Sequence, residues 1–126
     1  MSYTNALHLG TAHQEWLKIL EFYEIDIHIL EKRLTEVNQK NTAFESRAEV
    51  EHFQNQFIIQ RNNIIELRQR INAHAHEVMI DMQKHVGRVE EHKVVEHHVI
   101  EESLLNLERI INEIRHHFNR YLAKWF

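Results

Sequence analysis

The chain is poor in the residues that break helices or form covalent cross-links. Its 126 residues include no proline, no cysteine and only two glycines. Tight turns depend on glycine and proline, so a loop-rich or many-stranded fold is excluded. The lack of cysteine excludes disulfides, thiolate metal sites and thiol nucleophiles together. We expect a single domain over residues 1–126, because a second domain would lack the residues for its own core.

Long apolar runs and basic stretches are also missing. The longest uninterrupted apolar runs are three residues, such as Phe57-Ile58-Ile59, whereas a membrane span needs about 20. The first residues lack the basic and apolar regions of a signal peptide. Lysines and arginines are scattered among acidic residues, which argues against a surface that follows nucleic-acid phosphates. We therefore expect a soluble, cytoplasmic protein with no membrane or nucleic-acid partner.

Histidine is unusually abundant for a chain of this length. The chain has 12 histidines beside 15 lysines and arginines and 19 acidic residues, and its formal net charge is −4 with neutral histidines. Protonation of the histidines would reverse that sign, so the charge depends on pH in the mildly acidic range. There is no glycine-rich phosphate loop, and no serine lies in a nucleophile-elbow context. The sequence therefore indicates no particular reaction, and an enzyme is the less favoured class.

Apolar residues at spacings of three and four predict three long helices, at about 5–40, 43–86 and 88–126. Thr11 with Gln14 fits a capping box for the first helix, and Thr42 and Ser46 both offer one for the second. The three stripes are Trp16, Leu20, Tyr23, Ile27, Leu30, Leu34 and Val37; then Val50, Phe53, Phe57, Gln60, Ile64, Leu67, Ile71, His74, Val78 and Asp81; then His97, Ile100, Leu104, Leu107, Ile111, Ile114, Phe118, Tyr121 and Trp125.

The stripe changes phase near Gly87, which predicts that the chain reverses there, with Gly87 as a helix C-cap. The alternative is one helix that runs through Gly87 at a cost of about 1 kcal/mol. With reversals and short connections, the fold class is all-α, an elongated up-down-up bundle of three antiparallel helices. Apolar residues off the main stripe of the first helix, such as Phe22 and Ile25, leave room for dimerisation to complete the bundle, or for a helical partner protein.

Placing the hairpins in register gives the bundle two different ends. One end collects aromatic residues, and we expect them to pack as a closed plug. In this register, position 125 faces position 49 at the aromatic end, whereas position 74 faces position 100 toward the opposite end. The residues predicted to gather at this end are Val37, Phe44, Val50, Phe53, Phe118, Tyr121, Trp125 and Phe126.

The opposite end collects histidines and acids, and several of them continue the inward stripes. His13 precedes Trp16 by three residues, His74 follows Ile71 by three, and His97 precedes Ile100 by three. Pairs spaced by three or four residues share a helix face, so both members can reach one ion in a bundle core. The candidate metal ligands are His13, His74, Glu77, Asp81, His97 and Glu101, with Asp81 either a ligand or a supporting acid. Imidazole with carboxylate suits zinc, iron, manganese or nickel.

Three interpretations of this end remain open: a transition-metal site, a metal-free polar end that responds to pH, and a subunit interface. The main alternative function is a non-catalytic scaffold that forms helical oligomers. We expect His28, His52, His116 and His117 to lie on the surface. Glu49-x-x-His52 and Glu113-x-x-His116 spell the Glu-x-x-His pattern of ferritin-like di-iron sites. The inward positions beside them are apolar, however, so we expect these side chains to point outward and assign no family.

Overall fold

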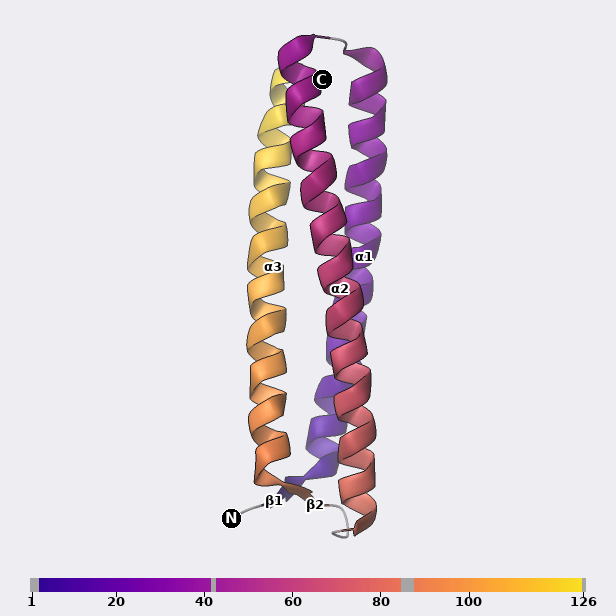
Figure 1. Ribbon diagram of the computed structural model, residues 1–126, viewed down its shortest axis with the longest axis vertical. Helices are drawn as coiled ribbons and strands as arrows, with labels where there is room; N and C mark the ends of the chain where they lie inside the picture. Colours follow the sequence, from indigo (N-terminus) through magenta and orange to yellow (C-terminus); the bar gives the residue numbers. More distant parts are fainter. Residues whose placement is uncertain (1–2, 42, 85–87, 126) are drawn as a thin grey trace. The chain divides into compact units, whose positions relative to one another are not determined.

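The computed structural model describes residues 3–41, 43–84 and 88–125, and its fold is an all-α three-helix bundle (Figure 1). Helix α1 spans Ala6–Lys40, α2 spans Phe44–Lys84 and α3 spans Glu91–Trp125. The predicted helices are therefore found within a few residues of their expected bounds. Within the described residues, no helix has a stretch both long and apolar enough to cross a membrane.

The chain reverses between α2 and α3, so the alternative of one continuous helix is wrong. Figure 1 shows α2 and α3 as separate helices that run in opposite directions. Gly87 and His85, which the sequence placed at this turn, lie outside the described residues.

Two short strands accompany the helices and were not expected from the sequence. Strand β1 (Tyr3–Asn5) pairs antiparallel with β2 (Arg88–Glu90), with Thr4 opposite Val89. Each strand is only three residues long, which is too short for an alternating pattern to be recognised in a sequence. The pairing joins the segment before α1 to the segment before α3.

Two of the expected helix caps are wrong. Helix α1 begins at Ala6, so Thr11 lies inside the helix and does not cap it. Ser46 lies inside α2 and is fully buried, with its Oγ atom 2.9 Å from the hydroxyl oxygen of Tyr121. Thr42 lies outside the described residues. A serine that the sequence pattern offered as a cap therefore serves as a buried hydrogen-bonding group instead.

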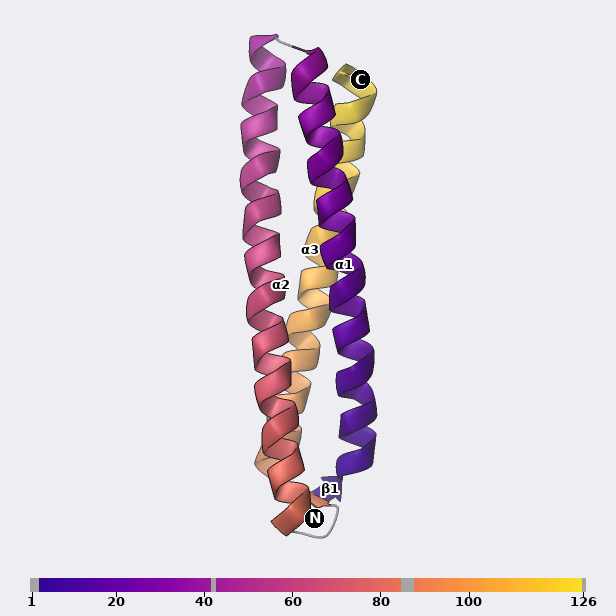
Figure 2. The same cartoon turned by 90° about the vertical axis from the view of Figure 1, so that its right-hand side faces the viewer.

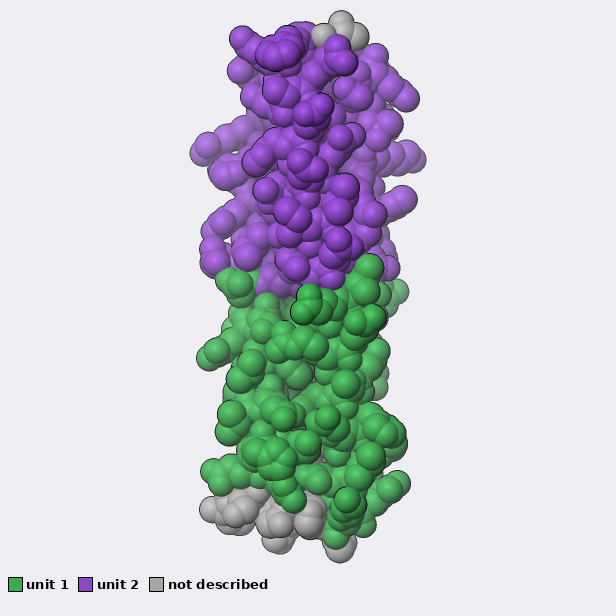
Figure 3. Space-filling view, in the orientation of Figure 1, with its two compact units in different colours: residues 1–21, 65–106 green, residues 22–64, 107–126 purple. Residues whose placement is uncertain are grey.

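The helices contribute to two compact units, coloured separately in Figure 3. Unit 1 consists of residues 1–21 and 65–106, and unit 2 of residues 22–64 and 107–126. In each unit, segments of α1, α2 and α3 lie side by side, as both ribbon views show (Figures 1 and 2). The buried apolar residues of unit 1 are Leu9, Trp16, Leu20, Leu67, Ile71, Val78, Ile100 and Leu104.

Unit 2 contains the aromatic residues that the sequence assigned to one end. Phe53, Phe118 and Tyr121 are buried and in ring contact, with Phe53 and Phe118 centroids 5.2 Å apart. The indole Nε1 of Trp125 donates to Glu49 Oε2 at 3.2 Å, which confirms the predicted register of these two positions. Phe44 is 85% exposed, so its assignment to the plug is wrong. It is the first residue of α2, where a helical stripe gives little information on packing. Phe126 lies outside the described residues.

Candidate metal centre

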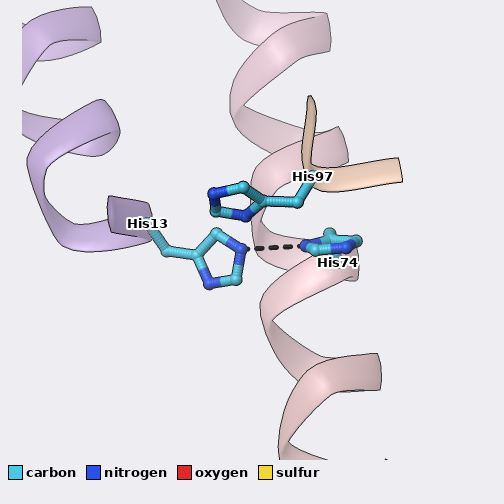
Figure 4. A group of neighbouring side chains, drawn as sticks. All are labelled: His13, His74 and His97. Carbon is cyan, nitrogen blue, oxygen red and sulfur yellow. Dashed lines mark hydrogen bonds between the residues drawn. The ribbon is translucent and has the colours of Figure 1, made fainter. Parts of the chain in front are cut away.

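Three histidines from three different helices meet in unit 1, and we refer to His13, His74 and His97 as the three-histidine cluster (Figure 4). Each one continues the apolar stripe of its helix, on α1, α2 and α3 respectively, so each side chain is directed into the core. Their exposed fractions are 2%, 3% and 5%. One ring nitrogen from each residue lies within 4.8 Å of the other two. The sequence therefore located these three residues and their common layer.

Hydrogen bonds fix the arrangement of two of these rings. His74 Nε2 lies 2.8 Å from the backbone carbonyl oxygen of Lys93, and His74 Nδ1 lies 2.8 Å from His13 Nε2. A carbonyl oxygen only accepts, so a neutral His74 carries its proton on Nε2 and donates it to Lys93. Its Nδ1 then has a lone pair and accepts from His13 Nε2–H. The Nδ1 lone pair of His74 is therefore directed into the cluster.

The cluster disfavours positive charge. Burial, and secondarily the proximity of His74, lower the pKa of His13 from 6.5 to about 4. Removing an imidazolium from water is costly when no carboxylate compensates for its charge. His13 is accordingly neutral at physiological pH, which is the protonation state that a metal ligand requires.

Trp16 packs against the cluster from α1. Its ring centroid is 4.3 Å from that of His97 and 5.5 Å from that of His13, and its side chain is 5% exposed. The His13 and His97 rings themselves are 5.3 Å apart. The indole thus covers one side of the cluster with an apolar surface and restricts the positions that the His97 ring can adopt.

The three predicted acidic ligands, Glu77, Asp81 and Glu101, make contacts outside the three-histidine cluster. Glu77 is half exposed, and its Oε2 accepts from Lys93 Nζ at 2.9 Å. This contact lowers the pKa of Glu77 and raises that of Lys93. Asp81 is buried and accepts from the backbone N–H of Glu90 at 3.0 Å. Glu101 is half exposed on α3 and lies 3.9 Å from the ring of the neighbouring His98. Among the described residues, the group close enough to hold one ion contains histidines alone.

Glu77 and Asp81 connect α2 to the residues that lead into the third histidine, His97. Residues 74, 77 and 81 lie on one side of α2. Residues 74 and 77 contact Lys93 in the first turn of α3, and residue 81 contacts Glu90, the last residue of β2. His97 follows Lys93 by one helical turn. Glu77 and Asp81 therefore anchor the helical segment that carries the third histidine.

Most other histidines are on the surface. His28, His52, His116 and His117 are exposed, as predicted, and so are His76, His92 and His98. Glu113 accepts from Arg109 at 2.9 Å, with more than half of its side chain exposed. The two Glu-x-x-His sequences thus provide no inward-facing pair of histidines. The side chains of His8 and His85 lie outside the described part of the chain.

Sequence reasoning missed the contribution of Lys93. Its backbone carbonyl determines the tautomer of His74, and a backbone atom has no residue-specific signal in a sequence. The Glu77–Lys93 ion pair could have been anticipated only from the register between α2 and α3.

Comparisons with known proteins add no assignment. No protein-family model matches the chain, and neither curated protein sequences nor solved structures give a significant match. The arguments below therefore depend on the geometry and chemistry of this chain.

Proposed function

We propose that this three-helix protein binds a divalent transition-metal ion, with His13, His74 and His97 as its protein ligands. The observation that carries the proposal is the meeting of three buried imidazoles, one from each helix, with ligand atoms within 4.8 Å of one another. Nitrogen ligands in a tetrahedral zinc site, each about 2.0–2.1 Å from the ion, lie about 3.3 Å apart. Binding would therefore bring the ring nitrogens closer together by up to about 1.5 Å.

The hydrogen bonds around the cluster support this proposal. Metal-bound histidines commonly donate their second ring N–H to a carbonyl or carboxylate, which fixes the ring and its tautomer. His74 already donates Nε2–H to Lys93 O and directs Nδ1 into the cluster. Binding requires His13 to give up its Nε2 proton, most simply by moving it to Nδ1. The ion then replaces the hydrogen bond between the two rings.

The donor set narrows the choice of ion. Imidazole nitrogen suits zinc, copper, iron and nickel, whereas manganese prefers oxygen ligands. With no carboxylate in the cluster among the described residues, zinc is the ion we propose first, followed by nickel and iron. A two-metal centre would need bridging carboxylates, which the described cluster does not contain.

The test measures zinc stoichiometry and stabilisation in protein prepared without a histidine tag. We expect one zinc per chain and a rise in melting temperature, since an ion at one hundred times its dissociation constant stabilises the folded state by about 2.7 kcal/mol. The matched variants are His97→Leu, which alters a buried histidine of the cluster, and His98→Leu, which alters the exposed histidine next to it. Only His97→Leu should abolish the zinc effect. Equal zinc binding by both variants, each shown to be helical, would contradict the proposal.

A second candidate is self-association through helix α1, which the exposed residues Phe22, Ile25 and Ile29 favour. Their side chains are 50–58% exposed and recur at spacings of three and four, the pattern of a coiled-coil seam. Sedimentation equilibrium at several protein concentrations tests this candidate. We expect a dimer for the native chain and a monomer for Ile25→Glu. A native chain that is monomeric at high micromolar concentration would exclude it.

A further inference from the structure

The three-histidine cluster provides fewer donors than a tetrahedral ion needs. Zinc and cobalt(II) take four ligands in such sites, and sites with three protein ligands hold a small molecule in the fourth position. Among the described residues, no fourth histidine or acid joins the cluster. Glu77 and Asp81 are committed to Lys93 and to the backbone of Glu90. The described histidines and acids therefore leave the fourth position of the ion open.

The charge of the loaded site determines what kind of molecule that is. Three neutral imidazoles leave the two positive charges of the ion uncompensated, and an isolated charge is expensive to bury. The acids nearest to the cluster do not reach it: Glu96 Oε2 is 3.9 Å from His74 Nε2, on the edge of the ring that faces Lys93. An anion that binds the ion directly would remove part of this cost. A neutral ligand would not.

On the basis of the proposed metal centre, we propose that the loaded cluster takes one small exogenous anion as its fourth ligand. The anion binds the ion directly, in the position that the three imidazoles leave open. Its chemical class is a compact anion with one oxygen or nitrogen donor atom, of the size of azide or formate.

The surroundings of the cluster set the size limit. The Trp16 ring lies 4.3 Å from His97 and leaves no room for a bulky group on that side. On the side of α2 and α3, a groove of about 290 Å³ reaches His74, so this member of the cluster borders on solvent although its side chain is buried. The groove is lined by Arg70, Ala73, His74, Glu77, Val95, Glu96, Val99 and Ile100. The charged side chains of the groove are Arg70, Glu77 and Glu96, so the attraction for an anion comes from the bound ion itself.

The test uses the full chain loaded with cobalt(II), whose visible spectrum reports the ligands of the ion. Azide is added to the loaded protein, and bound cobalt is measured after dialysis. We expect a saturable spectral shift at one azide per cobalt, with cobalt retained. Benzoate, which is too large for the cluster, should give less than a tenth of that shift at the same concentration. His98→Leu is the matched control and should respond to azide as the native chain does.

The possible failures of the two proposals are distinguishable. If cobalt binds at one per chain but azide leaves its spectrum unchanged, the fourth ligand is a protein group or a water that azide does not displace, and only this inference is overturned. If azide removes cobalt from the protein, or if benzoate shifts the spectrum as strongly as azide, the inference of a compact open position is likewise wrong, while the proposed metal binding stands. If neither cobalt nor zinc binds, the proposed function itself is wrong and the anion site is lost with it.

Discussion

The backbone carbonyl of Lys93 and the ring of His74 lie 2.8 Å apart, so the first turn of α3 determines which nitrogen of a histidine on α2 carries the proton. The side chain of Lys93 returns to α2 at Glu77. One residue of α3 therefore contacts α2 through both its backbone and its side chain. This double contact links the metal-binding chemistry that we propose to the packing of α3 on α2.

The first prediction concerns acid. His13 has a pKa of about 4 in the folded protein against 6.5 for an ordinary histidine. As the pH falls below about 6.5, the unfolded chain takes up a proton that folded His13 resists, so folding stability decreases. The loss ends near pH 4, where both states are protonated, and totals about 3 kcal/mol. Urea unfolding of metal-free protein at pH 7.5, 5.5 and 4.5 measures this loss.

His13→Leu and His28→Leu are the variants for this prediction, since the first residue is buried and the second exposed. The difference in unfolding free energy between pH 7.5 and 4.5 should shrink by about 2.5 kcal/mol in His13→Leu and stay unchanged in His28→Leu. An identical pH dependence of native protein and His13→Leu would show that His13 is not the responsible group.

The second prediction separates a supporting acid from a ligand. Asp81→Ala removes the acceptor for the backbone N–H of Glu90 in β2, and leaving such a donor without its partner costs about 1–3 kcal/mol. We expect zinc stoichiometry to remain at one per chain, because Asp81 is not part of the cluster. Chemical unfolding and elemental analysis of the same preparation measure both quantities. Loss of zinc from a folded Asp81→Ala protein would make Asp81 a ligand after all.

The third prediction concerns the ion pair of Glu77 with Lys93. Both groups reach solvent, with side chains 46% and 17% exposed, and such pairs contribute about 0–1 kcal/mol. Glu77→Gln should therefore lower the unfolding free energy by less than about 1 kcal/mol. Zinc affinity should fall at most a few-fold, as the Lys93 carbonyl still holds His74. Titration calorimetry with zinc distinguishes this from the loss of binding expected if Glu77 were a direct ligand.

The fourth prediction tests the aromatic core of unit 2. Phe118 is fully buried and in ring contact with Phe53 and Phe57, whereas Phe44 is 85% exposed. Phe118→Ala should cost about 3–5 kcal/mol, because it removes a buried ring and leaves a cavity. Phe44→Ala, the matched control, should change stability by no more than about 0.5 kcal/mol. Similar destabilisation by both substitutions in urea unfolding would contradict the described packing.

The fifth prediction concerns the buried hydroxyl pair of unit 2. Ser46 Oγ and Tyr121 OH lie 2.9 Å apart and are shielded from solvent. Ser46→Ala and Tyr121→Phe should each cost about 1 kcal/mol. Their combination should cost less than the sum, because the second substitution removes a hydroxyl that has already lost its partner. A double-mutant cycle measures this coupling, and strict additivity would mean that the two hydroxyls do not interact.

The helices and the three histidines could be predicted because a helical stripe extends beyond its apolar part without a change of phase. His13, His74 and His97 occupy inward positions of the helical stripes whatever their chemistry, so periodicity alone predicts that they are buried. Glu77 and Glu101 also share helix faces with candidate ligands. Periodicity places a side chain on a face but does not determine its partner, which is Lys93 on α3 for Glu77 and His98 on the same helix for Glu101.

Other features depend on information that a local pattern lacks. The pairing of β1 with β2 joins two segments of three residues each, too few for a period to be visible. Ser46 fits the sequence pattern of a helix cap but lies inside α2, where its hydroxyl is hydrogen-bonded to that of Tyr121. That contact joins residues 75 positions apart. A hydrogen bond across such a separation is outside the reach of capping rules.

The separation of the proposed ligands along the chain has a consequence for synthesis. His13 and His74 are 61 positions apart, and the third proposed ligand, His97, belongs to the last helix. During synthesis, α1 and most of α2 therefore leave the ribosome before a complete set of ligands exists. Tight binding of one ion would mark the moment at which the last helix has docked, so the release of a metal-sensitive dye could time that event during refolding.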